Sequence, residues 1–221
     1  MNNQEILSHI DHTLLKPFST WEQIAEICND AIENKTASVC IPPSFVKPVK
    51  EAYGDKLTIC TVIGFPLGYN TTATKVFEAK EAVKEGADEI DMVINIGALK
   101  DGKYDFVQNE IAEIKKAVGD NILKVIVETC FLTEEEKIKI CELVTAAGAD
   151  FIKTSTGFGT AGATREDIRL FKEHIGPNVK MKAAGGVKTK EDLVDFLELG
   201  CERIVTSSAV SMLKGGEAQG Y

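Results

Sequence analysis

The sequence lacks the features that nucleic-acid-binding and membrane proteins need. Its 221 residues carry 25 Lys and Arg against 34 Asp and Glu, a formal net charge of −9, and no basic stripe that could follow a phosphate backbone. No apolar run approaches the ~18 residues of a membrane span, and the N-terminal MNNQEILSHIDHTLL is unlike a signal peptide. We therefore expect no nucleic-acid or membrane partner, and a cytoplasmic location.

The six cysteines and three histidines also lack the spacing that metal or disulfide chemistry requires. The cysteines form no C-x-x-C pair, and most lie in apolar runs, where a free thiol packs as a small hydrophobic group. The histidines form neither an H-x-H nor an H-E-x-x-H pattern. We therefore expect reduced thiols and chemistry without a metal or another cofactor.

The length and the even composition of the chain predict one domain over residues 1–221. A chain of this size can bury one large core but is short for two domains with a linker, and no Pro/Ser-rich tract interrupts it. The last residues, about 214–221, form the Gly-rich KGGEAQGY, for which we expect a flexible tail.

Short runs rich in Val, Ile and Thr alternate with segments of helical period. Strands are predicted at 9–13, 38–42, 57–63, 89–94, 123–128, 151–154, 179–183 and 203–206. Helices are predicted at 20–34, 44–53, 72–85, 104–117, 133–147, 164–174 and 189–199, with a short one from about Ser207. Capping boxes begin two of them, at Thr133 with Glu136 and at Thr189 with Asp192. Strict alternation predicts a parallel sheet covered by helices.

Eight strand–helix units favour an α/β fold of the (β/α)₈ TIM-barrel type. An open doubly wound sheet usually has about five or six strands, and its dinucleotide-binding form needs a G-x-G-x-x-G turn after an early strand. The segments IPPSF and IGFPLG do not supply that turn. A barrel also predicts where function lies, because barrel enzymes keep their active sites at the C-terminal ends of the strands.

A weak internal repeat relates three of the units. The segments EGADEIDMVI (85–94), AGADFIKTST (147–156) and LGCERIVTSS (199–208) share a glycine that would end a helix, a short turn and a strand. The residue five past the glycine is Asp91 in the first segment and Lys153 in the second. We therefore expect Asp91 and Lys153 to lie at the same height in the barrel.

Lys153 is the candidate nucleophile, although a lysine at a strand end can also simply extend to solvent. An amine that attacks a carbonyl must be neutral, which an ordinary lysine pKa of about 10.4 makes rare at pH 7. Lys182 ends the next strand, and two ammonium groups in one interior would lower the pKa of at least one of them. Lys180 shares the face of Lys182 nearer the start of the strand and is the second candidate for this neighbour.

Two carboxylates occur in apolar surroundings where an unpaired charge would be costly. Asp91 lies in EIDMVIN and would be either a structural partner of a lysine or a proton-transfer group. Asp11 lies in HIDHTLLKP at the end of the first strand, beside Thr13. A helix N-cap or turn role is an alternative for Asp11.

Glycine and hydroxyl residues follow the last three strands. AAGGVK (183–188) and TSSAV (206–210) follow the seventh and eighth strands, and Gly157 follows the sixth. In many barrels these loops and the helix after the eighth strand bind a phosphate through backbone N–H groups. The pattern predicts a phosphate site, to which Lys188 could add a positive charge.

Eight segments of the sequence carry a resemblance to a known family: IDHTLLKP, VCIPPSFV, VIGFPLG, EIDMVINIG, VIVETC, FIKTSTGF, KAAGGVK and the terminal GY. Together they closely resemble the deoxyribose-phosphate aldolase family of class I, Schiff-base aldolases. The resemblance places the imine-forming lysine on Lys153, the second active-site lysine on Lys182 and the proton-relay aspartate on Asp91. It places a proton-carrying C-terminal tyrosine, on a mobile tail, on Tyr221. The implied substrate-binding residues are Asp11, Thr13, Thr156 near a substrate hydroxyl, Gly157, Gly185, Gly186, Ser207 and Ser208.

The resemblance implies reversible cleavage of 2-deoxy-D-ribose 5-phosphate to D-glyceraldehyde 3-phosphate and acetaldehyde, in deoxyribose catabolism. Two positions depart from the family: Lys188 stands where most members have Arg, and Phe158 where some carry a basic residue. The alternatives are an imine-forming barrel aldolase for another sugar phosphate and a non-catalytic barrel that binds phosphosugars and regulates a partner. Apolar faces on the outer helices favour a homodimer.

Overall fold

Parallel strands close into a barrel in chain order, so that β8 pairs with both β7 and β1. The computed structural model describes residues 1–213. The strands are β1 Ile10–Thr13, β2 Ser38–Ile41, β3 Ile59–Ile63, β4 Glu89–Val93, β5 Ile122–Ile126, β6 Phe151–Lys153, β7 Lys180–Ala184 and β8 Cys201–Thr206. The predicted (β/α)₈ barrel is therefore confirmed, with strand boundaries shifted by one or two residues.

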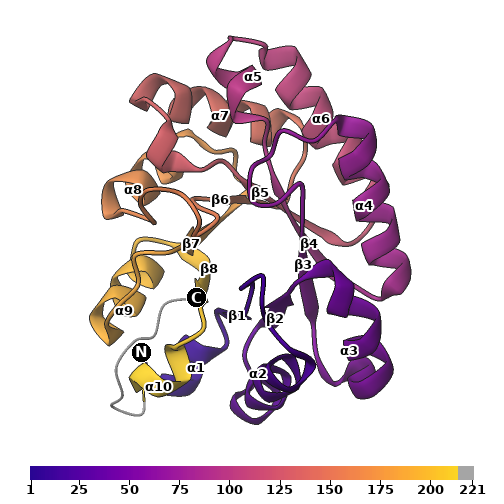
Figure 1. Cartoon of the computed structure of the whole chain (residues 1–221). Helices are drawn as coiled ribbons and strands as arrows, with labels where there is room; N and C mark the ends of the chain where they lie inside the picture. Colours follow the sequence, from indigo (N-terminus) through magenta and orange to yellow (C-terminus); the bar gives the residue numbers. More distant parts are fainter. Residues whose placement is uncertain (214–221) are drawn as a thin grey trace.

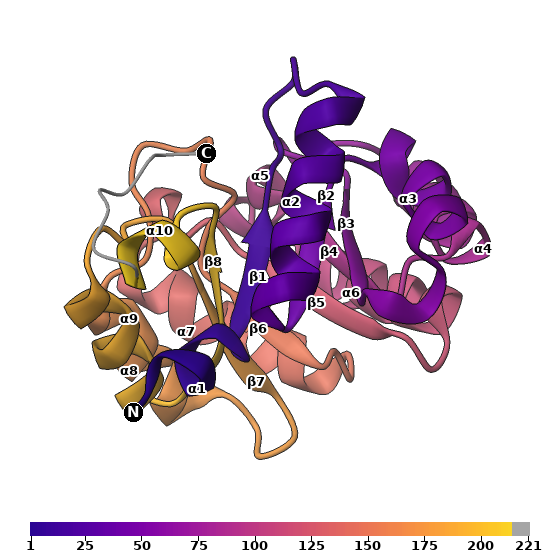
Figure 2. The same ribbon diagram turned by 90° about the horizontal axis from the view of Figure 1, so that it is seen from below.

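Helices form a ring around the strands, as the view along the barrel shows (Figure 1). The α-helices are α1 Asn3–Leu7, α2 Trp21–Asn34, α3 Val46–Tyr53, α4 Thr72–Glu85, α5 Ile96–Lys100, α6 Tyr104–Val118, α7 Glu134–Ala146, α8 Arg165–His174, α9 Lys190–Glu198 and α10 Ala209–Leu213. Short 3₁₀ helices are η1 Pro43–Phe45, η2 Gly54–Lys56 and η3 Thr129–Phe131. The side view in Figure 2 shows α2 lying beside β1. Within residues 1–213, no helix is both long and apolar enough to cross a membrane.

Sequence signals account for several of the helix ends. Both predicted capping boxes form, at Thr133 and at Thr189. The three repeat glycines, Gly86, Gly148 and Gly200, have φ values of 111°, 74° and 109°, a left-handed conformation that glycine adopts without strain. The sequence analysis did not predict α1 and α5. Each has five residues, too few for a helical period to be visible.

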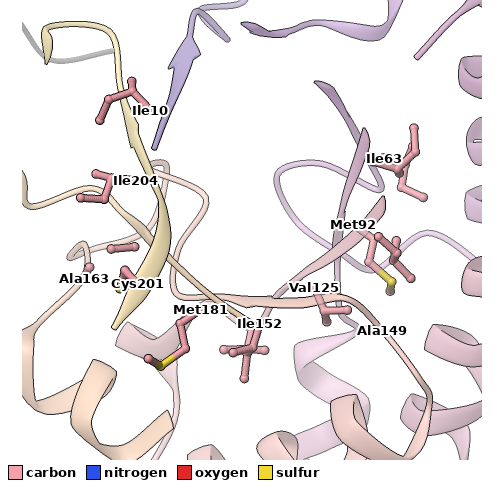
Figure 3. Close-up of a cluster of buried hydrophobic side chains, with 14 of the residues drawn as sticks. Ile10, Ile63, Met92, Val125, Ala149, Ile152, Ala163, Met181, Cys201 and Ile204 are labelled. Atoms are coloured by element: carbon pink, nitrogen blue, oxygen red, sulfur yellow. The ribbon is translucent and has the colours of Figure 1, made fainter. Parts of the chain in front are cut away.

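Side chains on the strands alternate between the barrel interior and the helices. Figure 3 shows apolar side chains such as Ile152, Met181 and Ile204 on the helix side of their strands. These three side chains are at most 4% exposed and belong to the main hydrophobic cluster. Alternation then turns Lys153 and Lys182 to the interior, because each is one residue away from an outward-facing neighbour. The apolar shell between strands and helices thus fixes which residues face the centre.

Candidate active site

Asp91, on β4, lies at the centre of a buried cluster of charges. Its Oδ2 atom is 2.8 Å from Nζ of Lys153 on β6 and 2.7 Å from Nζ of Lys182 on β7. Its Oδ1 atom is 2.9 Å from Nζ of Lys124 on β5. All four side chains are at most 1% exposed. The predicted proximity of Asp91, Lys153 and Lys182 is confirmed.

The register of the strands explains why Asp91 and Lys153 meet. Asp91 pairs with Lys124, and Lys124 pairs with Phe151. A (β/α)₈ barrel has a shear of about eight residues, so the level of the barrel shifts by about one residue from each strand to the next. Lys153 is two residues past Phe151 and two strands from β4, which returns it to the level of Asp91. The repeat in the sequence therefore predicted the correct geometry.

A second set of charges lies next to this one inside the barrel. Asp11 on β1 has Oδ2 2.5 Å from Nζ of Lys182 and Oδ1 2.8 Å from Nη1 of Arg203 on β8. Glu89 on β4 has Oε2 2.6 Å from Nζ of Lys124 and 3.1 Å from Nη1 of Arg203. Asp11 is therefore an ion-pair residue within a strand, and the alternative of an N-cap or turn role is wrong.

Three members of the cluster were missed by the sequence analysis: Lys124, Glu89 and Arg203. The signal for Lys124 was present, because it interrupts the apolar strand ILKVI as Lys153 interrupts FIK. Glu89 is two residues before Asp91 and therefore faces the same side of β4. Arg203 gave a weaker signal because it follows a charged residue in a strand with exposed positions.

Opposite charges hold the ionised forms of this cluster in place. Burial raises the pKa of Asp91, but Lys124, Lys153 and Lys182 outweigh it and hold that pKa well below its ordinary value. Burial lowers the pKa of Lys182, but Asp11 and Asp91 outweigh it and hold that pKa above its ordinary value. The expectation that a neighbouring ammonium would lower a lysine pKa is thus wrong for Lys182. The carboxylates between the lysines were absent from that argument.

Lys180 is not part of the cluster. It begins β7 at the N-terminal end of the barrel, its side chain is 51% exposed, and Nζ lies 2.8 Å from Oε2 of Glu202. The ranking of Lys182 above Lys180 as the neighbour of Lys153 is therefore confirmed.

The glycines predicted to bind phosphate lie in turns after adjacent strands. Gly157 has φ 89°, and Gly185 and Gly186 have φ 71° and 75°, values in the left-handed region that favours glycine. The loop after β6 contacts the end of β7 and the loop that follows it, since the Ala163 N–H donates to the Ala184 carbonyl at 3.0 Å and to the Gly185 carbonyl at 3.3 Å. These turns gather at the C-terminal mouth of the barrel. Phosphate binding there stays a prediction.

The remaining predicted binding residues lie at the same end. Thr13 is buried at the end of β1, with its hydroxyl donating to the Asp11 carbonyl at 2.7 Å. Ser207 and Ser208 follow β8 directly, and the Ser208 N–H donates to Thr206 Oγ1 at 2.9 Å. The Lys188 side chain is exposed.

Thr156 and Phe158 follow β6. Thr156 is 1% exposed. Phe158 is 47% exposed and packs edge-on against Phe65, with ring centroids 5.4 Å apart. The aromatic ring gives this part of the mouth an apolar wall. Tyr221 and the predicted tail lie outside the described residues.

Among residues 1–213, two groups of buried side chains have potential metal-ligand atoms within 4.8 Å of one another: Cys40, Cys60 and Asp91, and Asp11, Cys60 and Glu89. All of them belong to or adjoin the charge cluster. Three ammonium groups already contact Asp91 and would oppose a divalent cation there. Chemistry without a metal stays a prediction, with this electrostatic argument in its favour.

Charged side chains converge at the centre of this (β/α)₈ barrel, although apolar side chains could fill the same space. Burying charges costs stability, and buried ionisable groups with shifted pKa values are typical of active sites. The cluster therefore indicates an enzyme. The chain belongs to the DeoC/LacD family of aldolases, whose family model matches residues 6–209. The deoxyribose-phosphate aldolase of Clostridium botulinum (strain Alaska E43 / Type E3) is 62% identical over 221 residues, 100% of both chains.

Solved structures agree with this assignment. An aldolase designated QR15 is 43% identical, with a TM-score of 0.91 over 96% of this chain and 95% of that chain. The deoxyribose phosphate aldolase of Aeropyrum pernix, described as having a unique tetrameric structure, is 27% identical, with a TM-score of 0.88 over 97% of this chain and 92% of that chain. The resemblance predicted from the sequence motifs is confirmed, and the protein is an aldolase.

The pKa shifts predict how the cluster responds to acid. The folded-state pKa values of Asp11 and Asp91 lie below the ordinary 3.8, so their stabilisation is complete above that value and is lost as pH falls towards the folded pKa. Urea unfolding of the native protein should show that the free energy of unfolding decreases as the pH is lowered from 6 to 3. Asp91→Asn should remove about 3–5 kcal/mol at pH 7, since it leaves buried ammonium groups unpaired.

The same variant should reduce the slope of unfolding free energy against pH below pH 4 by up to about 1.4 kcal/mol per pH unit. Asp101→Asn is the control, because Asp101 forms an ion pair with Lys103 in which both side chains are more than 60% exposed. Equal slopes for Asp91→Asn and the native protein would contradict the assignment of a depressed pKa to Asp91.

Proposed function

We propose that this aldolase cleaves 2-deoxy-D-ribose 5-phosphate reversibly to D-glyceraldehyde 3-phosphate and acetaldehyde through an imine on Lys153. The curated relative that is 62% identical over the whole chain bears the name of this activity. The observation that carries the mechanism is the position of Lys153. Its amine is buried at the level of Asp91 and next to Lys182, at the end of the barrel where active sites lie.

The charge count of the cluster supports Lys153 as the nucleophile. Four cations, Lys124, Lys153, Lys182 and Arg203, face three carboxylates, Asp11, Glu89 and Asp91. Lys153 contacts one carboxylate, whereas each of the other cations contacts at least two. Loss of a proton from Lys153 therefore leaves three cations against three carboxylates and gives the neutral amine that attack on a carbonyl needs.

In the proposed reaction, the electron acceptor is a protonated imine formed on Lys153. Its amine adds to C1 of the open-chain sugar and loses water, which gives a protonated imine. Asp91 with Lys182, through a water molecule, takes the proton of the C3 hydroxyl. The C2–C3 bonding electrons move into the imine, and C3 becomes the aldehyde carbon of glyceraldehyde 3-phosphate. Protonation of the enamine at C2 and hydrolysis release acetaldehyde and restore Lys153.

Residues at the mouth would hold the rest of the substrate. Backbone N–H groups of the turns at Gly157, Gly185 and Gly186, with Ser207 and Ser208, suit the phosphate, and Lys188 would add a charge. Asp11 and Thr13 would line the pocket, and Thr156 would contact a substrate hydroxyl. Asp11 also keeps Lys182 in place through the ion pair at 2.5 Å.

Lys153→Arg tests this proposal with little change in charge. Arginine keeps a cation beside Asp91 but does not form an imine, so kcat should fall by about a thousandfold or more. Release of glyceraldehyde 3-phosphate and acetaldehyde can be followed by coupled dehydrogenases. Lys180→Arg is the matched control, because Lys180 lies on the exposed end of β7, and it should keep activity within about twofold.

Both alternatives give other results in this assay. An aldolase for another sugar phosphate would turn over that compound in preference to 2-deoxyribose 5-phosphate. A phosphosugar-binding barrel would bind the compound equally well with Lys153→Arg and would show no turnover in the native protein.

Tyr221 is proposed to carry the proton to C2 of the enamine. Deletion of Tyr221 should therefore lower kcat by about ten- to a hundredfold, while binding of a phosphorylated competitive inhibitor changes less than about threefold. Tyr221→Phe, which removes only the hydroxyl, should reproduce the loss. Unchanged turnover in both variants would overturn the role of Tyr221.

We propose that the enzyme acts as a homodimer in the cytoplasm, in deoxyribose catabolism. Large apolar side chains are exposed on the outer helices, for example Phe77 at 66% on α4 and Phe106 at 42% on α6. The Aeropyrum pernix relative is described as tetrameric. Sedimentation equilibrium should give twice the chain mass of 24.0 kDa, and a mass of one or four chains would contradict a dimer.

A further inference from the structure

Glu128 lies in an unfavourable backbone conformation two residues after the end of β5. Its φ and ψ are 53° and 66°, in the left-handed region that residues other than glycine seldom occupy. Such a conformation is strained and persists only where other contacts require it. Glu128 is 2% exposed, so its carboxylate is also withdrawn from water. Both costs need a compensating interaction.

The backbone around Glu128 is arranged as in a bulge. The Val127 N–H donates to the Lys153 carbonyl at 3.0 Å, and the Thr129 N–H donates to the Thr154 carbonyl at 2.9 Å. Two residues along one segment, from Val127 to Thr129, thus match one residue along the other, from Lys153 to Thr154. This leaves Glu128 as the extra residue. Bulges redirect a side chain and are common next to active sites. Here the side chain turns towards the loop that follows Lys153.

The Glu128 carboxylate accepts hydrogen bonds from both donors of Thr156, its backbone N–H and its hydroxyl. The Thr156 N–H lies 3.1 Å from Oε1 and 3.3 Å from Oε2, and the Thr156 hydroxyl donates to Oε2. The Phe158 N–H donates to Thr156 Oγ1 at 3.0 Å. A threonine hydroxyl has one proton and two acceptor sites. Its proton and one acceptor site are therefore used, and one acceptor site is left.

We propose that Glu128 is a positioning residue that makes the Thr156 hydroxyl a hydrogen-bond acceptor for the substrate. With its proton directed to Glu128, Oγ1 can only accept a hydrogen bond from a hydroxyl of the sugar phosphate. The same contacts fix the turn at Gly157, which carries the predicted phosphate-binding N–H. This inference rests on the proposed function, and in particular on Thr156 as the residue that contacts a substrate hydroxyl.

Glu128→Gln tests the direction of the hydrogen bond at nearly constant size. An amide has one acceptor oxygen and one NH₂ group, so it cannot accept as Glu128 does at both oxygens, and its NH₂ would donate to Oγ1 and reverse the Thr156 hydroxyl. We expect kcat/KM for 2-deoxyribose 5-phosphate to fall about tenfold. In a Thr156→Val background the same substitution should change kcat/KM less than about twofold, and in a Thr156→Ser background it should again cost about tenfold.

Acetaldehyde provides the internal control, because it lacks the sugar hydroxyl and the phosphate. Borohydride trapping of acetaldehyde on Lys153 should be equally fast in Glu128→Gln and in the native enzyme. Equal losses of kcat/KM with and without the Thr156 hydroxyl, or slower trapping of acetaldehyde, would overturn the assignment. If Glu128→Gln does not fold, Glu128→Gly takes its place, since glycine adopts the left-handed conformation without strain.

The proposed function can be distinguished in the same experiment. Absence of turnover and of trapping in the native protein overturns the proposed function, and with it the role of Glu128. Normal turnover in the native protein with independent effects of the two residues overturns the role of Glu128 alone.

Discussion

The carboxylate of Asp91, shared among three lysines, is the interaction on which the interior of the barrel depends. Three ammonium groups lie 2.7–2.9 Å from the Asp91 carboxylate oxygens. They would repel one another in a space that excludes water, and the negative charge of Asp91 makes their proximity possible. Asp11 and Glu89 extend the same arrangement to Arg203. Replacing such a cluster by apolar side chains often stabilises a protein, so its presence points to function.

The cluster and the mouth divide the work of the site between two kinds of structure. Strands hold the charged groups, because strand register fixes which residues lie side by side and each strand is buried between barrel interior and helices. Loops hold the groups proposed for the phosphate and the sugar hydroxyls, because glycine turns can present backbone N–H groups without side chains in the way. Glu128 connects the two by tying the loop after β6 to the end of β5.

The sequence predicted the fold well, since hydrophobic period, capping boxes and repeat glycines all reflect local chemistry. It also predicted that Lys153, Lys182 and Asp91 lie together, because the repeat aligns Asp91 with Lys153 and Lys182 ends the strand next to that of Lys153. It did not predict that Lys124, Glu89, Arg203 and Glu128 contribute to the site, and it left the carboxylates out of the expected pKa of Lys182. Pairing across the barrel decides those properties, and one sequence read segment by segment does not contain it.

The imine on Lys153 is the central claim, and trapping it is the most direct test. The enzyme is incubated with acetaldehyde, reduced with borohydride, digested and mapped by mass spectrometry. The account predicts one ethylated lysine, Lys153, and loss of activity in proportion to its modification. The absence of an adduct, or an adduct on Lys182 or Lys180 alone, would contradict it.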